Sequence, residues 1–142
     1  MITDLTVLQE IRCAWNGVES LRGRIQIGLF ATQMGVIGGV YPFGVADAAH
    51  NLPFLHAYAV LNDVLHQLAR EGNFSCKSFF LGALLQASER VLPWKDFAVI
   101  KFGADRRNDL AHRGVVLASS DCWKYIDAIK TELTSWSILL PS

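Results

Sequence analysis

Apolar residues recur along this chain at intervals of three and four, the spacing that gathers them on one face of an α-helix. No segment keeps the alternation of two that is typical of a half-buried strand, and residues 114–117 are too short to indicate either structure. The pattern therefore predicts an all-α fold, a helical bundle of about five to six helices. The first predicted helix shows the spacing in Leu5, Leu8, Ile11, Trp15 and Val18.

Capping and turn residues mark where the predicted helices begin and end. Thr3 or Asp4 can cap the first helix, which should lose its regularity in the glycine-containing residues 17–23. Asn51 caps the second helix, because an asparagine directly before an apolar, proline-containing turn is a common start. A glycine and an asparagine at 72–73 end it.

The second half of the chain gives three more predicted helices. Ser75 or Ser78 caps the first of them, and Pro93 both stops it and opens the next. That helix runs to about Arg113, and the polar residues 119–121 cap the last one.

Length and charge limit the possible functions. The 142 residues, 51% of them hydrophobic, are enough to bury a core, so residues 1–142 are predicted to form a single domain. With 13 basic and 13 acidic residues the formal net charge is zero, so nucleic acid could be attracted only by a local patch. The N-terminus has no basic stretch followed by an apolar run, so no signal peptide is expected.

The three cysteines, Cys13, Cys76 and Cys122, are far apart and odd in number. They form no CxxC pair and no cysteine–histidine spacing typical of zinc, so no disulfide framework, metal or cofactor is expected. Free thiols agree with a reducing, cytoplasmic location.

Residues 25–46 carry no formal charge, and this length raises the question of a membrane span. Gln26, Gln33, five glycines and Pro42 argue against it, because a span would place a proline–glycine turn inside lipid. We therefore expect buried core or a subunit interface here, a homodimer, and no stable membrane insertion. A small membrane-associated helical protein is the weaker alternative.

The densest group of charged and polar residues lies at 105–114, Asp-Arg-Arg-Asn-Asp-Leu-Ala-His-Arg-Gly. Part of this group has a structural explanation. His112 and Arg113 complement the negative end of a helix, and Gly114 is a natural residue to follow it. Asp109 and Arg113 are four residues apart and can form an ion pair on the helix surface.

The same residues could also bind a phosphodiester. Arg106, Arg107 and Arg113 lie close together in sequence, and like charges repel one another unless an anion is expected there. Asn108 and His112 are four residues apart and share a helix face, whereas Arg107 lies about 140° around the helix from His112. Arg107 must therefore reach around the helix or meet a histidine of another subunit.

The run Arg107-Asn108-Asp109-Leu110-Ala111-His112 resembles the signature of HEPN domains. In that family an arginine, often followed by a polar residue, precedes a histidine at a similar short spacing. The chain length and the all-α prediction agree with the family. The resemblance implies a helical bundle that dimerises with the two motifs facing each other across a cleft. It also implies metal-independent RNA cleavage, often in toxin–antitoxin or other defence systems.

On this resemblance, Arg107 and His112 are the catalytic pair and Asn108 is the supporting polar residue. Arg106 also has a permitted spacing from the histidine, so either arginine can be the important one; Arg106 and Arg113 are further candidates to bind RNA. The implied partners are RNA, a second copy of the chain and a cognate antitoxin protein. The family also includes members without nuclease activity, so the alternative is a non-catalytic HEPN-like dimeric scaffold that binds RNA or regulates a partner.

The chemistry is coherent from the residue types alone. RNA supplies its own nucleophile, the 2′-hydroxyl, and a histidine can accept its proton or protonate the leaving 5′ oxygen. A guanidinium can pair with the phosphate and stabilise its transition state. The other histidines and the tryptophans are expected to have structural roles: His50, His56, His66, Trp15, Trp94, Trp123 and Trp136.

Overall fold

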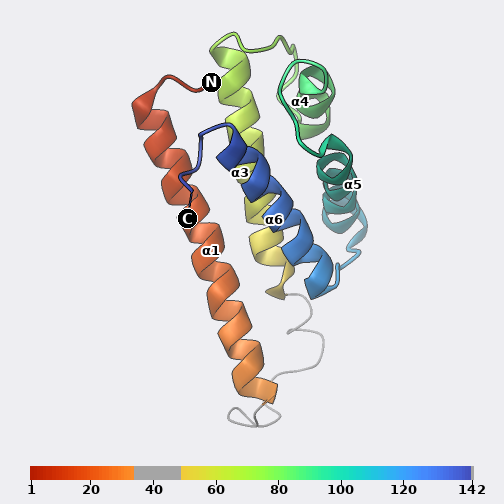
Figure 1. Ribbon diagram of the computed structural model, residues 1–142. Coiled ribbons are helices and arrows are strands. Elements are labelled where there is room, and N and C mark those ends of the chain that lie inside the picture. The colour runs from red at the N-terminus through yellow and green to blue at the C-terminus, as the bar shows by residue number, and fades with distance from the viewer. Residues whose placement is uncertain (34–48, 142) are drawn as a thin grey trace.

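The computed structural model describes residues 1–33 and 49–141. Within those residues the chain forms α-helices and no strand, which confirms the predicted all-α helical bundle (Figure 1). The helices are α1 Leu5–Gln33, α3 Asn51–Arg70, α4 Leu81–Ser88, α5 Phe97–Arg113 and α6 Ser119–Ser135.

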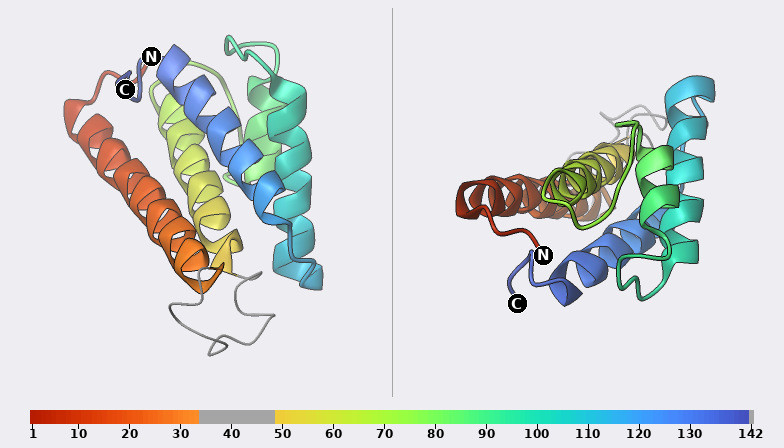
Figure 2. Two further views of the ribbon diagram at one scale, coloured as in Figure 1. Left: turned by 60° about the horizontal axis from the view of Figure 1, so that its bottom comes forward. Right: turned by 90° about the horizontal axis from the view of Figure 1, so that it is seen from above.

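Helix α3 is the centre of the bundle. It contacts α1, α6, α4 and α5, and the view from above shows it between α1 on one side and the α4–α5 pair on the other (Figure 2). Full burial of a leucine or phenylalanine side chain contributes about 1.5–3 kcal/mol, so this face of α3 supplies much of the stability. Its buried apolar residues step by three and four, as predicted: Phe54, Ala57, Tyr58, Leu61, Val64, Leu65 and Leu68.

Helix α5 approaches its neighbours most closely at Gly103. A Cβ atom at this position would lie 2.0 Å from the hydroxyl oxygen of Tyr58 in α3 and 2.7 Å from Cδ1 of Tyr125 in α6. The Tyr58 hydroxyl donates a hydrogen bond to the Ile100 carbonyl at 2.9 Å. Burial raises the pKa of Tyr58 well above its usual value, so the hydroxyl keeps the proton that it donates. Glycine is therefore required for this depth of packing.

A buried carboxylate fixes the connection that leads into α5. Glu132 of α6 is 2% exposed, and both its oxygens accept the Lys95 N–H at 2.9 Å. The same carboxylate accepts the Asp96 N–H at 3.0 Å, and Asp96 then caps α5 by accepting the Val99 N–H at 3.3 Å. Because Glu132 holds these two N–H groups, α5 begins at Phe97 and not at the predicted proline.

Helix α1 runs without a break to Gln33, so the predicted loss of regularity at residues 17–23 was wrong. Val18, which lies in that stretch, is fully buried, and α1 packs along α3. A Cβ at Gly17 would lie 3.2 Å from Cε1 of His56 in α3, which shows how closely the two helices approach. Burial against α3 therefore outweighs the cost of about 1 kcal/mol that each interior glycine carries.

Helix α4 is shorter than predicted, because neither serine at its start caps it. The helix begins at Leu81, with Phe80 in the extended N-cap position, and ends at Ser88. The Ser88 carbonyl accepts the indole N–H of Trp94 at 3.2 Å, and the Ser88 hydroxyl donates to the Leu85 carbonyl. These bonds turn the chain away before the predicted end at the proline.

Of the uncharged residues 25–46, the structure describes only residues 25–33. Residues 25–33 continue α1, with Ile27 71% exposed. Residues 34–46 lie outside the described residues, so buried core or a subunit interface there stays a prediction. None of the helices in the described part of the chain combines the length and the apolar content that a transmembrane span requires.

Candidate functional site

The last two turns of α5 carry the predicted site, and a glycine defines where they end. Gly114 adopts a left-handed conformation with φ 66°, and its N–H donates to the Leu110 carbonyl at 3.1 Å. The next N–H, of Val115, donates to the Asp109 carbonyl at 3.4 Å. This arrangement closes a helix, so the predicted end at Arg113 is confirmed. The site lies at the end of the bundle where α3 and α6 begin (Figure 1).

Arg106 is committed to contacts within the bundle. Its Nη2 lies 3.7 Å from Oδ2 of Asp121, in the first turn of α6, and the two side chains are 30% and 41% exposed. Its guanidinium carbon also lies 5.9 Å from the ring centroid of Phe102, one turn earlier on α5. The ion pair and the cation–π contact both lie along the α5–α6 junction, so an anion that binds Arg106 would have to compete with Asp121.

Arg107 has a different environment. It follows Gly103 and Ala104 on the buried face of α5, and its side chain is half-buried. Its Nε is enclosed but donates no hydrogen bond to a described residue. An enclosed donor without a partner costs free energy, about 1–3 kcal/mol, so the Arg107 guanidinium has an unmet hydrogen bond inside the bundle.

Asn108 and His112 both lie on the exposed side of α5. They are four residues apart and share a face, as predicted, and neither side chain bonds to a described residue. Arg107 lies about 140° around the helix from His112. The burial of Arg107 and the exposure of His112 agree with that angle, so one chain does not bring these two side chains onto the same face.

Asp109 and Arg113 form the surface ion pair predicted from their spacing. Their side chains meet at 3.7 Å, and Arg113 is 72% exposed. An exposed pair of this kind contributes little to stability, so Arg113 can exchange its partner for a phosphate at small cost. The structural explanation of the motif therefore holds for Asp109, Arg113 and the glycine that follows, and His112 lies in the last turn of α5 as it predicts. It does not account for Arg107 and Asn108, and neither these two side chains nor His112 forms an ion pair or hydrogen bond with a described residue.

The predicted cap at Asn51 was wrong, because His50 occupies the N-cap position and the Asn51 side chain instead binds the segment that follows the motif. Asn51 is the first residue of α3, and its amide group exchanges two hydrogen bonds with the backbone of Leu117, at 3.0 and 3.3 Å. Leu117 lies in the short connection after the motif, and its side chain is buried. Close by in sequence, the His50 ring packs edge-on against Trp123 of α6 at 5.5 Å. These contacts hold the segment that follows His112 against the start of α3.

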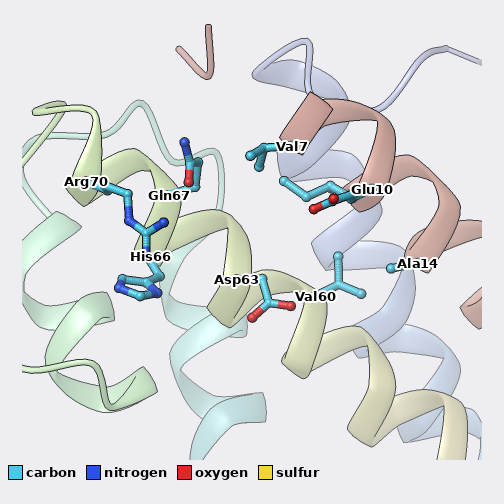
Figure 3. Close-up of a pocket in the computed structure, with 9 residues that line it drawn as sticks. Val7, Glu10, Ala14, Val60, Asp63, His66, Gln67 and Arg70 are labelled. Atoms are coloured by element: carbon cyan, nitrogen blue, oxygen red, sulfur yellow. The ribbon is translucent and has the colours of Figure 1, made fainter. Parts of the chain in front are cut away.

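A separate groove of about 240 Å³ lies between α1 and α3 (Figure 3). Figure 3 shows Glu10 of α1 facing α3, with Asp63, His66 and Arg70 along α3. The groove shares no residue with the α5 motif. His66 also packs on Phe79 with ring centroids 4.5 Å apart, which agrees with its predicted structural role. The groove could not be predicted from the sequence, because its charges come from two helices far apart along the chain.

In residues 1–33 and 49–141, no group of three or more histidine, cysteine, aspartate or glutamate side chains is arranged to hold a metal ion. Comparison with protein-family models, curated proteins and solved structures found nothing that matches this chain. The resemblance to HEPN domains therefore depends on the α5 motif and on the all-α fold.

Proposed function

We propose that this chain is a HEPN-type, metal-independent endoribonuclease that acts in the cytoplasm as a toxin or defence effector. One observation carries the proposal. Within a dense cluster of charges, Arg106, Asp109 and Arg113 are paired, whereas Arg107 and His112 have no protein partner among the described residues. Unpaired groups of these two types, near the capped end of α5, are suited to bind a phosphate and to transfer a proton.

The proposed reaction uses the RNA's own 2′-hydroxyl. His112 accepts the proton of this hydroxyl, whose oxygen forms a bond to the neighbouring phosphorus. The bond from phosphorus to the 5′ oxygen breaks, and a second histidine donates a proton to that oxygen. Arg107 stabilises the extra negative charge on the phosphorus-bound oxygens. The products are a 2′,3′-cyclic phosphate and a 5′-hydroxyl end.

The separation of Arg107 from His112 around α5 supports a site that two chains share. In a homodimer, Arg107 of one protomer can meet His112 of the other, and the two histidines supply an acid and a base. Asn108 accompanies His112 on its face and orients the substrate, while Arg113 adds attraction for the RNA backbone. A cognate antitoxin would cover this exposed end of the bundle.

Cleavage of a mixed RNA pool by the purified full chain, with EDTA present, tests the proposed activity. We expect cleavage that persists in EDTA and leaves 2′,3′-cyclic phosphate ends. An RNA that lacks only the 2′-hydroxyl at the cut site should resist, because the attacking oxygen is missing. Products with 3′-hydroxyl ends, or activity that disappears on chelation, would contradict the mechanism.

Mixing the unmodified chain with the His112→Ala chain tests the shared site. A mixed dimer keeps only one of the two histidines, so it lacks either the acid or the base and should be inactive. Once the chains have exchanged partners, activity should fall towards the square of the fraction of unmodified chain. Activity that stays proportional to the amount of unmodified chain would place a complete site in one chain.

The second candidate is a non-catalytic HEPN-like dimeric scaffold that binds RNA or regulates a partner. Arg107 and His112 lie about 140° apart around α5. A dimer that does not bring Arg107 of one chain to His112 of the other would have no catalytic pair, which favours the scaffold function. RNA binding without cleavage, measured on the same chain that fails the EDTA assay, would select this function.

A further inference from the structure

A second cavity, of about 230 Å³, lies between α1, α6 and the segment that follows α6. Helices α1 and α6 both pack against α3, and ion pairs reach across between them, Arg22 with Asp127 at 2.5 Å and Glu19 with Lys130 at 3.7 Å. The cavity shares no residue with the α5 motif. Seven residues line it: Arg12, Trp15, Asn16, Glu19, Lys130, Leu139 and Leu140.

Arg12 is held in place by one of its nitrogens only. Its Nε donates to the Ile138 carbonyl at 2.9 Å, and the side chain is half-buried. The terminal guanidinium nitrogens make no hydrogen bond or ion pair with a described residue. A guanidinium that is fixed at Nε and free at its outer edge can pair with a carboxylate through two parallel hydrogen bonds.

Trp15 adds a second uncommitted donor. The residue is 4% exposed, and its indole N–H has no hydrogen-bond partner in the described part of the chain. Buried indole N–H groups usually find an acceptor, because leaving one unsatisfied is unfavourable. The tryptophan lines the cavity one helical turn after Arg12, so the two residues belong to the same wall.

The remaining lining limits the charge and the shape of a ligand. Lys130 and Glu19 face each other at 3.7 Å and largely neutralise one another. Arg12 therefore leaves the cavity with one net positive charge, which suits a monoanion better than a polyphosphate. Leu139 and Leu140 come from the segment after α6 and supply an apolar wall. The volume is that of a small site.

We propose that this cavity binds a small monocarboxylate with a short apolar chain. The carboxylate pairs with the outer nitrogens of Arg12 and takes the indole N–H of Trp15 as a further donor. The apolar chain packs on Leu139 and Leu140. This site is independent of the proposed ribonuclease activity, because it uses no residue of α5.

Two-dimensional ¹H–¹⁵N NMR of the full chain, titrated with butyrate, tests the proposal. The chain has four tryptophans, and the spectrum of Trp15→Phe identifies which indole signal belongs to Trp15. Butyrate should shift that signal in a saturable way at millimolar concentration, whereas the neutral butyramide and chloride should not. Arg12→Gln should weaken binding about tenfold, because it removes a charge-assisted pair.

Arg24→Gln is the matched control, since Arg24 is an exposed arginine of the same helix and does not line the cavity. It should bind butyrate like the unmodified chain. If Arg12→Gln does not fold, Lys130→Gln still tests the site, because loss of its positive charge should weaken the butyrate-dependent shift of the Trp15 indole signal, whereas Arg24→Gln should leave that shift unchanged. An indole signal that butyrate leaves unchanged, or that chloride shifts equally, would overturn the proposal. So would a Trp15 indole proton that exchanges magnetisation only with a bound water, because the donor would then already be satisfied.

Discussion

Arg106 and Asp121 lie 3.7 Å apart and join the middle of α5 to the first turn of α6. The adjacent arginine, Arg107, has no such partner, and its Nε is enclosed without a hydrogen bond to a described residue. Two neighbouring residues of the same type therefore differ in what they can offer to a substrate. One contributes to the bundle, and the other has an unused guanidinium at the same helix end.

This difference predicts which arginine matters for cleavage. Arg107→Gln should lower the rate of RNA cleavage by at least about a hundredfold, because charge-stabilising groups often contribute about 3 kcal/mol to the transition state. Arg106→Gln should change the rate little and reduce stability slightly, by no more than about 1 kcal/mol. Single-turnover cleavage and thermal unfolding of both variants give the comparison. A larger rate loss for Arg106→Gln would reverse the assignment.

RNA binding should depend on the local charge of Arg113. The formal net charge is zero, so no field of the whole molecule attracts RNA. Arg113→Gln should weaken binding and reduce the salt dependence of log K by about one unit or less. Fluorescence anisotropy over a range of salt concentrations measures this slope. Arg90→Gln, an exposed arginine outside α5, is the control, and an equal loss for both variants would place the RNA elsewhere.

Two glycine substitutions should have opposite effects on the stability of the fold, because Gly103 is closely packed and Gly82 is not. Gly103→Ala should destabilise the fold by about 1–3 kcal/mol or more, since its Cβ would lie 2.0 Å from the Tyr58 hydroxyl. Gly82→Ala should stabilise it by up to about 1 kcal/mol, because a Cβ there meets nothing within 4 Å and alanine favours a helix. Urea unfolding of both variants measures the difference. A neutral Gly103→Ala would show that α5 packs less closely than described.

The stability of the fold should depend on pH through Glu71, which accepts hydrogen bonds from Thr3 near the N-terminus. Hydrogen bonds from the hydroxyl and the N–H of Thr3, followed by one from Gln67, lower the pKa of Glu71 below its ordinary 4.5. A lowered pKa in the folded state means that the ionised carboxylate stabilises the fold. That stabilisation should be complete above pH 4.5 and should be lost as the pH falls through the folded-state pKa.

The difference in unfolding free energy between the unmodified chain and Glu71→Gln measures this effect. It should be constant above pH 4.5 and shrink at lower pH. A difference that does not change with pH would mean that Glu71 acts through its shape and not through its charge.

Local signals in the sequence predicted much of the fold. Asp4 caps α1 by accepting the N–H groups of Thr6 and Val7, and Gly72 and Gly114 follow α3 and α5 with positive φ. Each of these features depends on residues a few positions apart, where the chain geometry is nearly fixed. The all-α fold follows for the same reason, because the apolar spacing is a property of single helices.

Contacts between distant residues could not be predicted in this way. The amide of Asn51 binds Leu117, 66 residues away, instead of capping its own helix. The carboxylate of Glu132 fixes the N–H of Lys95, 37 residues away, and so sets where α5 begins. The sequence placed Gly103 only inside a helix, whereas the structure shows that a side chain there would meet Tyr58. Such contacts depend on how the helices pack.

The candidate site, too, could be predicted only in part. Its place at the end of α5 and the separation of Arg107 from His112 around the helix follow from helix geometry. The pairing of Arg106 with Asp121 does not, because it depends on the angle between α5 and α6. The sequence therefore left two arginines as equal candidates, and the structure shows that their contacts differ.

The most direct test of the account is RNA cleavage by the His112→Ala variant. His112 is exposed and makes no bond to a described residue, so the variant should unfold at the temperature of the unmodified chain. Its cleavage rate in EDTA should fall by about a hundred- to ten-thousand-fold, the usual loss when a positioned acid or base is removed. His66→Ala, which changes a histidine outside the motif, should retain the activity. Cleavage by His112→Ala at the unmodified rate would contradict the account and leave His112 as a residue that only ends a helix.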